Sequence, residues 1–206
     1  MEAGKQFPFE GRVISEKALA MAIEDAVFIV LGKALPKASI CILLAQSAVE
    51  TGADATGKRV TANWNAYGIK AYGSQDYFES PTKEGHGATE QRIVAKFRSF
   101  PDAKSGAVAF VRLIATAPRY RDAWKKVEAG DPVGYALALG QGGYYTGNPL
   151  VYAKGVARHW AWCALRMLNY GVTPDEIRRF QAEHSIGVDG LLGPVTRGAL
   201  RVALGG

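Results

Sequence analysis

The stretch ILLAQSAVETG, residues 42–52, decides the fold of this chain because it is an almost wholly apolar helix that ends in one acid. Pro36 before the stretch and Gly52 at its end predict where the helix starts and stops. Apolar side chains surround nearly its whole circumference, which is typical of a helix packed on all sides; they are Ile42, Leu43, Leu44, Ala45, Ala48 and Val49. The stretch therefore predicts a central helix of a globular domain.

Glu50 is the only charged residue of this helix. Burial penalises a charged carboxylate, so Glu50 is expected to be paired, hydrated in a cleft or protonated. A solvent-facing residue on the last helical turn is the alternative reading. The polar segment that follows favours a cleft that binds carbohydrate, because aromatic rings stack on sugars, amides bind hydroxyls and an acid protonates a leaving oxygen. Its candidate residues are Asn63, Trp64, Asn65 and Tyr67.

One paired motif and three further segments resemble the glucosaminidase family of peptidoglycan hydrolases, glycoside hydrolase family 73. AQSAVETG and NAYGIKA are similar to the family's paired pattern, approximately AQxALESG and then NLFGIKG. The segments KFRSFPDAKSGAVAFVRLI, PRY and GGYYTGNPLVYA follow in the family's order. The resemblance covers about residues 35–157. It implies a mainly α, lysozyme-like α+β catalytic domain with a small β-hairpin lobe over residues 1–157.

The resemblance also implies an activity, that of an endo-β-N-acetylglucosaminidase that cleaves β-1,4 bonds of the peptidoglycan glycan strand. Glu50 would be the general acid. Glu84, 34 residues later (84 − 50), falls where the family carries a second acid, and an exposed hairpin glutamate is the alternative for it. Tyr144 falls on the family's cleft aromatic, and Tyr145 is a credible substitute, because the segment carries an inserted Gly147. The residues expected to bind substrate are Trp64, Asn65, Tyr67, Tyr145 and Tyr152.

Several readings of the chemistry stay open at this point. Glu84 could activate water on the opposite sugar face and give inversion, or the acetamido group of the substrate could attack with a tyrosine holding it. A muramidase or lytic transglycosylase on the same fold is a rival activity. A catalytically silent protein that binds the cell wall is a rival of another class.

The tail, residues 158–206, resembles the helical peptidoglycan-binding repeat module, whose pattern is FQxxxGLxVDGxxGPxTxxAL. Matching positions run from Phe180 to Leu200, with Asp189 in a tight turn and Thr196 in the last helix. Thr173 and Pro174 predict the start of the preceding helix. The tail is therefore expected to be a small helical module that either binds the wall or only packs against the catalytic domain.

Local signals predict further elements. Ser15 is a helix cap for a segment that continues to Leu31, and Asp102 begins another helix that Pro118 ends. Residues 75–100 predict a β-hairpin whose turn lies around residues 83–89. A helix is expected over residues 156–170.

The charge and composition of the chain limit the kinds of partner that it is expected to bind. A formal charge of +6 suits an anionic partner such as the bacterial wall, and the scattered basic residues argue against nucleic acid. Neither a cofactor nor a metal is expected, since the three histidines, His86, His159 and His184, stand in no ligand motif. Cys41 and Cys163 are expected to be free buried thiols. The sequence shows no secretory signal and no membrane span, so we expect a protein made in the cytoplasm that reaches the wall by another route, as a phage endolysin, as part of a virion or through a dedicated secretion machine. A monomer is expected.

Overall fold

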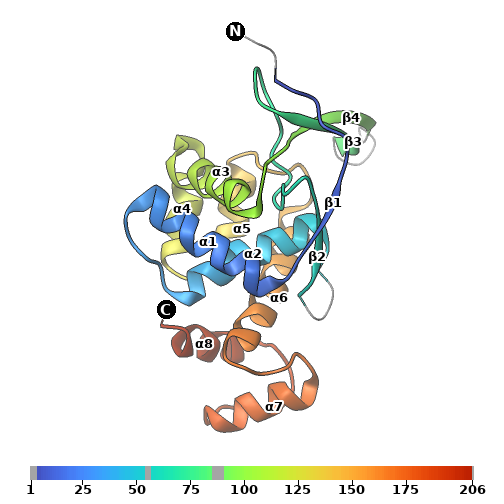
Figure 1. Ribbon diagram of the computed structural model, residues 1–206. Coiled ribbons are helices and arrows are strands. Elements are labelled where there is room, and N and C mark those ends of the chain that lie inside the picture. The colour runs from blue at the N-terminus through green and yellow to red at the C-terminus, as the bar shows by residue number, and fades with distance from the viewer. Residues whose placement is uncertain (1–3, 54–56, 85–90, 206) are drawn as a thin grey trace.

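The computed structural model describes residues 4–53, 57–84 and 91–205, and it is mainly helical (Figure 1). The helices are α1 (Glu16–Leu31), α2 (Lys37–Thr51), α3 (Ala103–Thr116), α4 (Arg121–Glu128), α5 (Pro132–Gln141), α6 (Pro149–Met167), α7 (Pro174–Glu183) and α8 (Pro194–Ala203). The strands are β1 (Gly11–Ile14), β2 (Arg59–Ala62), β3 (Tyr77–Glu84) and β4 (Gln91–Arg98). The predicted mainly α fold with a small β lobe is confirmed.

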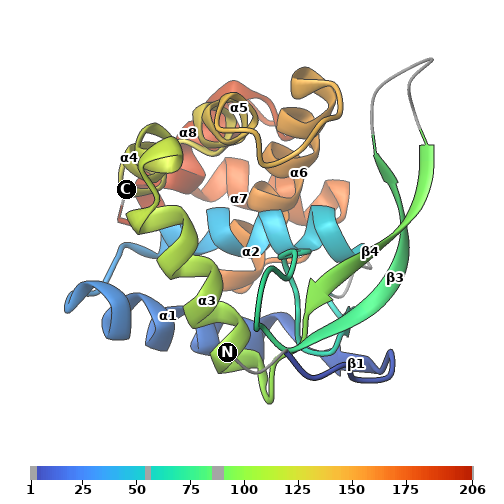
Figure 2. The same ribbon diagram turned by 90° about the horizontal axis from the view of Figure 1, so that it is seen from above.

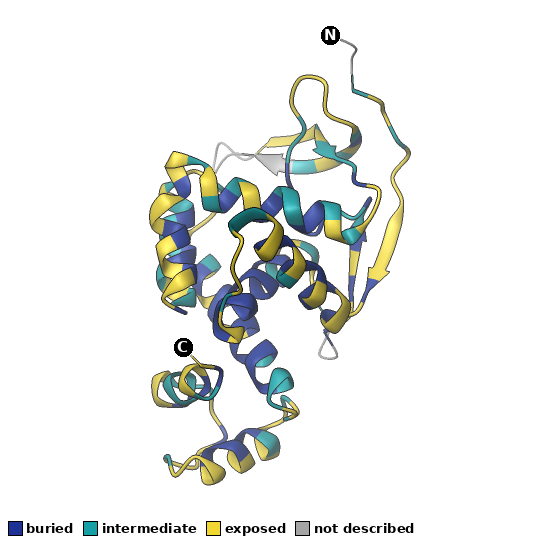
Figure 3. Cartoon of the chain, turned by 60° about the vertical axis from the view of Figure 1, so that its left-hand side comes forward, coloured by how far each residue is buried: buried dark blue, intermediate teal, exposed yellow. Residues whose placement is uncertain are grey.

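Helix α2 is the centre of the helical part, with α1, α3, α5 and α6 around it (Figure 2). Every residue from Ala38 to Ala48 is buried, as the apolar circumference predicted. Helix α6 lies along α2, and the indole Nε1 of Trp160 donates a hydrogen bond to the carbonyl oxygen of Ala38 at 2.9 Å. Buried residues gather where the helices meet, and exposed residues cover their outer faces (Figure 3). Each fully buried Leu or Ile contributes roughly 1.5–3 kcal/mol to folding.

The predicted ends of α1 and α3 are confirmed. The Ser15 hydroxyl accepts a hydrogen bond from the backbone N–H of Ala18, and Gly32 ends α1 with a left-handed φ of 68°. Asp102 caps α3 by accepting from the N–H of Ser105 at 2.7 Å. Side-chain oxygens at these positions satisfy backbone N–H groups that have no partner within the helix, so the local sequence determines the ends.

Two antiparallel strand pairs form the β structure. Strands β3 and β4 pair from Tyr77 opposite Arg98 to Glu84 opposite Gln91, which confirms the hairpin, while residues 85–90 of its expected turn lie outside the described residues. In Figure 2 the hairpin stands beside the C-terminal end of α2. The pair β1–β2 was not predicted, because two four-residue strands are too short for their alternation to be recognised.

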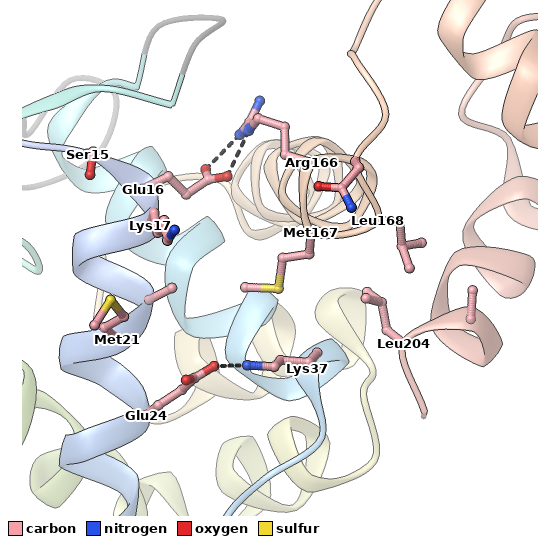
Figure 4. Close-up of a pocket in the computed structure, with 13 residues that line it drawn as sticks. Ser15, Glu16, Lys17, Met21, Glu24, Lys37, Arg166, Met167, Leu168 and Leu204 are labelled. Atoms are coloured by element: carbon pink, nitrogen blue, oxygen red, sulfur yellow. Dashed lines mark hydrogen bonds and ion pairs between the residues drawn. The ribbon is translucent and has the colours of Figure 1, made fainter.

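A buried ionic cluster joins α1, β2 and α6. The Arg166 guanidinium donates two hydrogen bonds to the Glu16 carboxylate, from Nε at 2.7 Å and from Nη2 at 2.6 Å (Figure 4). Arg59 reaches the same carboxylate from β2 at 3.3 Å, and the Cys163 thiol donates to it at 3.0 Å. Both cysteines are free and buried, as expected. The cluster ties together segments that are up to 150 residues apart in sequence.

The tail is organised around Gln181. Its amide nitrogen donates to the Asp189 carboxylate at 2.7 Å and to the Thr196 hydroxyl at 2.9 Å, and its amide oxygen accepts from the N–H of Gly190 at 2.9 Å. The motif residues therefore hold the loop between α7 and α8. Phe180, Leu200 and Leu204 belong to the same hydrophobic cluster as Trp160 and Leu165 of α6. The domain boundary predicted between residues 157 and 158 falls inside the continuous helix α6. Within the described residues, no helix combines the length and the apolar character needed to cross a bilayer.

Candidate active site

Glu50 lies on the last turn of α2, at the rim of the hydrophobic core. The phenol oxygen of Tyr152, on the first turns of α6, donates a hydrogen bond of 2.7 Å to Glu50 Oε1. The other carboxylate oxygen, Oε2, lies beside Gly68, where a Cβ atom would stand 3.5 Å from it. The carboxyl can still be reached from solvent. One oxygen is thus held by a tyrosine, and the other lies close to the backbone of Gly68.

The surroundings of Glu50 favour the protonated form. Protein atoms packed around this carboxyl remove part of its hydration and raise its pKa above 4.5, although the residue is exposed on its open side; the hydrogen bond from Tyr152 offsets only part of that rise because it stabilises the charged form. Among the described residues, no Lys or Arg forms an ion pair with Glu50. A carboxyl whose pKa is raised in this way, without a cation beside it, is suited to donate a proton.

Three tyrosines pack beside the acid or against its neighbours. The Tyr145 ring stacks on Tyr152 with 3.9 Å between centroids, and its hydroxyl donates to the carbonyl oxygen of Ala136 at 2.9 Å. Tyr144 donates to the carbonyl oxygen of Tyr67 at 2.7 Å. Burial raises the pKa of all three phenols, so they stay protonated near neutral pH. They act as hydrogen-bond donors and not as bases.

The start of α6 differs from the sequence prediction, which placed a helix over residues 156–170. Asn148 caps a helix that begins at Pro149, and its side chain accepts from the N–H groups of Leu150 and Val151. An Asn followed by Pro is a helix-start signal that could have been recognised. The earlier start matters because it places Tyr152 on a rigid helix that faces Glu50.

Two of the expected substrate-binding residues, Asn65 and Tyr67, are buried. Asn65 is 4% exposed, and its amide bonds the backbone of Ile69 and Arg98, so it holds the loop in place. Tyr67 is 1% exposed and stacks on Phe110 at 3.6 Å. The predicted direct contact of these two side chains with substrate is corrected to a supporting role, because they are buried.

Trp64 is half-buried and lines a hollow of its own. It has a left-handed φ of 58°, its ring lies 5.9 Å from the Arg12 guanidinium, and both line a hollow of about 370 Å³ with Phe7 and Glu10. This hollow shares no lining residue with the surroundings of Tyr152. The expected contact of Trp64 with substrate therefore stays a prediction.

Glu84 ends β3 opposite Gln91. Its side chain lies outside the described part of the structure, so the position of this carboxyl relative to Glu50 remains a sequence expectation. His86 also falls outside the described residues.

A groove of about 840 Å³ adjoins the Glu50–Tyr152 pair. The C-terminal end of α2 with Gly52 forms one side, and α6 from Tyr152 to Trp162 forms the other. Burial and the nearby Arg158 cation lower the pKa of His159 in this groove to about 4, so its imidazole is neutral at neutral pH. The sequence prediction did not identify this groove, because its α6 residues from Lys154 to Trp162 follow the last motif segment and have no motif of their own.

A separate hollow of about 720 Å³ lies at the other end of α6, between α1 and α8 (Figure 4). Arg166, which lines it, is 14 residues from Tyr152 along the helix (166 − 152), or about 21 Å. This hollow is therefore distinct from the surroundings of Glu50. Across residues 4–53, 57–84 and 91–205, no cluster of three or more His, Cys, Asp or Glu side chains could hold a metal ion.

A family model described as Glucosaminidase, mannosyl-glycoprotein endo-beta-N-acetylglucosaminidase, matches residues 36–163, which is more than half of the chain. The chain belongs to the glucosaminidase family. It is therefore a glycoside hydrolase, as the motifs predicted. The glucosaminidase region includes α2 with Glu50 and extends through most of α6, beyond the segment that carried the resemblance in the sequence.

Solved structures agree with this glucosaminidase assignment. A crystal structure of a peptidoglycan hydrolase from Sphingomonas sp. A1 is 26% identical, with a TM-score of 0.51 over 71% of this chain and 86% of that chain. A mutant of a peptidoglycan hydrolase from the same organism has the same identity and TM-score over 72% of this chain and 99% of that chain. The lysozyme-like fold expected for a glucosaminidase is confirmed. A search of curated proteins gave no match.

Proposed function

We propose that this glucosaminidase cleaves the β-1,4 bond after N-acetylglucosamine in the glycan strand of bacterial peptidoglycan, with Glu50 as the general acid. The observation that carries the proposal is the Glu50 carboxyl itself, which has a raised pKa, no cationic partner among the described residues and a tyrosine on one oxygen. The similarity to the Sphingomonas peptidoglycan hydrolase supports the choice of polymer. The proposed place of action is the bacterial wall, where a monomer with a charge of +6 is attracted to anionic polymers.

In this mechanism Tyr152 orients the acid. Its hydroxyl donates to Oε1, so the proton resides on Oε2, the oxygen beside Gly68. Oε2 then protonates the glycosidic oxygen as the bond to the anomeric carbon breaks. The stack of Tyr145 on Tyr152 holds the donor tyrosine, and Tyr144 is fixed by its bond to the Tyr67 carbonyl.

The attacking group has two candidates, and each predicts a stereochemical outcome. Glu84, acting as a base on water, requires carboxyl groups roughly 6.5–9.5 Å apart and gives inversion at the anomeric carbon. Attack by the substrate's own acetamido group gives retention and makes Glu84 dispensable. NMR of the first-formed product, combined with the activity of Glu84→Gln, distinguishes the two.

The test of the proposed acid is Glu50→Gln, which keeps the shape of the side chain and removes the transferable proton. We expect kcat on purified sacculi to fall by roughly 10²–10⁴-fold, the contribution of a general acid. Glu128→Gln is the matched control and should keep its activity. Glu128 lies on α4 and forms an exposed ion pair with Lys33. Equal clearing of sacculi by Glu50→Gln and the wild type would overturn the assignment.

Product analysis tests the bond that is cut. Reducing-end N-acetylglucosamine supports a glucosaminidase that acts on peptidoglycan. Reducing-end or anhydro N-acetylmuramic acid would instead show a muramidase or a lytic transglycosylase. Absence of any soluble product from the wild type would favour a protein that only binds the wall.

A further inference from the structure

One face of α6 continues from the proposed active site along the groove of about 840 Å³. The residues of α6 that line it recur every three or four positions, which is the spacing of a single helix face; they include Tyr152, Gly155, Arg158, His159 and Trp162. Gly155 is the point of close approach to α2, since a Cβ there would stand 3.4 Å from Val49 Cγ2. From the Asn148 cap to Trp162 the face extends over 14 residues (162 − 148), or about 21 Å. The groove therefore suits an extended ligand better than a single sugar.

Two cations on this helix have no acidic partner in the structure. Lys154 and Arg158 are both exposed, and neither forms an ion pair with an acid among the described residues. They stand one turn apart, where two like charges destabilise a helix by a few tenths of a kcal/mol. The Arg158 guanidinium lies 5.3 Å from the centroid of the Trp162 ring, and the arrangement combines a flat apolar surface with a positive charge. Such a surface is complementary to an anionic ligand.

The same two cations also line a second hollow, which connects the groove to the tail. Its volume is about 350 Å³, and it includes Leu192 and Arg197 from the segment around the start of α8. Arg197 donates to the Leu192 carbonyl at 2.6 Å, so its guanidinium is fixed beside the hollow. Positively charged side chains, Lys154, Arg158 and Arg197, therefore lie between the Tyr152 end of α6 and the tail.

We propose that this α6 groove binds the stem peptide of peptidoglycan, with Arg158 and Lys154 pairing with its carboxylates, while the attached glycan lies at Glu50. This inference rests on the proposed function. The sugars themselves are largely neutral, whereas the stem peptides carry the carboxylates that complement the two cations. Tyr152 connects the two sites, because it lines the groove and also donates to Glu50. Arginine suits the role since its planar guanidinium can bind a carboxylate through two parallel hydrogen bonds.

The experiment compares two substrates for each full-length variant. One is a glycan strand that retains its stem peptides, and the other is the same strand after enzymatic removal of the peptides and conversion of the lactyl carboxylates that this exposes into neutral amides. For Arg158→Gln we expect the ratio of kcat/KM between peptide-bearing and peptide-free strands to fall about tenfold, with the loss carried by KM. Arg158→Lys should keep most of the ratio because it keeps the charge. Lys154→Gln should lower the ratio in the same direction.

Arg121→Gln is the matched control, because it removes one exposed positive charge from α4. It should leave the ratio at the wild-type value. The wild-type ratio should also decrease as salt is added, since exposed charge pairs are screened.

Each other outcome has a definite meaning. An active wild type together with an unchanged ratio in Arg158→Gln would overturn the stem-peptide site and leave the proposed function in place. An equal loss on both substrates would assign the groove to the glycan and overturn the peptide assignment. A wild type that cleaves neither substrate would overturn both the proposed function and this inference.

Discussion

Tyr145 and Tyr152 stack on each other, but only the Tyr152 hydroxyl contacts Glu50. Tyr152 donates its proton to the Glu50 carboxylate, while Tyr145 directs its hydroxyl away, to the carbonyl oxygen of Ala136. The rings stack at 3.9 Å, so removing either hydroxyl leaves the aromatic surface in place. Replacing each tyrosine by phenylalanine therefore tests the effect of its hydroxyl on Glu50 while the stacking of the two rings is kept.

Tyr152→Phe should shift the pH dependence of activity. The Tyr152 hydrogen bond stabilises the charged carboxylate and lowers the pKa of Glu50, so its loss raises that pKa further. Because a general acid works while protonated, the falling limb of kcat/KM at high pH should move to higher pH. The measurement is a pH profile on sacculi.

Tyr145→Phe is the control for that profile. Its hydroxyl contacts a backbone carbonyl instead of the acid, so the position of the falling limb should stay at the wild-type value. A shift to lower pH in Tyr152→Phe would contradict the role of Tyr152 as the hydrogen-bond donor to Glu50.

At the scale of elements, the end of α5 determines how closely the tyrosine stack can approach it. A Cβ at Gly140 would lie 2.5 Å from the Tyr145 hydroxyl oxygen and 2.7 Å from its Cζ. The close approach of the Tyr145 ring therefore requires a glycine at position 140. The position of the Tyr145–Tyr152 stack thus depends on α5, a helix that carries neither tyrosine.

Gly140→Ala should displace Tyr145 and disturb the orientation of Tyr152. Because a misplacement of about 1 Å near a reacting group can cost up to about 10²-fold in rate, we expect kcat/KM to fall by roughly ten- to a hundredfold. The control is Gly198→Ala in α8, where a Cβ meets nothing within 4 Å. Replacing that helical glycine should stabilise the protein by about 0.5–1 kcal/mol without loss of rate. Full activity in Gly140→Ala would contradict the role of this packing.

At the scale of the whole molecule, the Glu16 cluster links the N-terminal helix to α6. Burial alone would raise the pKa of Glu16, but hydrogen bonds from Arg166 and Cys163 and the charges of Arg166 and Arg59 outweigh it, and the pKa lies below 4.5. Arg59 is completely buried, and its Nε and Nη1 atoms have no hydrogen-bond partner among the described residues. Glu16 is therefore the anion that compensates this arginine.

Glu16→Gln should reduce stability and its dependence on pH. A lowered pKa means that the carboxylate stabilises the fold above about pH 4.5 and that this contribution is lost as pH falls through the folded-state pKa. Removing one partner of a buried ion pair costs roughly 3–5 kcal/mol. Urea unfolding midpoints between pH 3 and 7 should be lower for the variant at neutral pH and should fall less steeply on acidification.

The exposed Lys33–Glu128 pair provides the comparison for the buried cluster. Glu128→Gln should change stability by less than about 1 kcal/mol, because exposed ion pairs contribute little. An acid dependence in Glu16→Gln as steep as that of the wild type would show that other carboxyl groups account for it.

The sequence by itself determined the features that depend on local chemistry. The caps at Ser15 and Asp102, the all-round burial of α2 and the family motifs that contain Glu50 could be recognised without coordinates, because they follow from neighbours a few residues apart. The β-hairpin was also predicted, since its strands are long and consecutive.

Only the tertiary structure decided which side chains surround the acid. Tyr152 contacts Glu50 across 102 residues, and Arg166 contacts Glu16 across 150, so neither contact has a periodic signal in the chain. The same motif segment contributes the exposed Gly68 and the buried Tyr67, one residue apart. Which of two adjacent residues faces solvent depends on what the rest of the fold places against them, and for that reason the sequence located the acid while the packing of α6 on α2 determined its site.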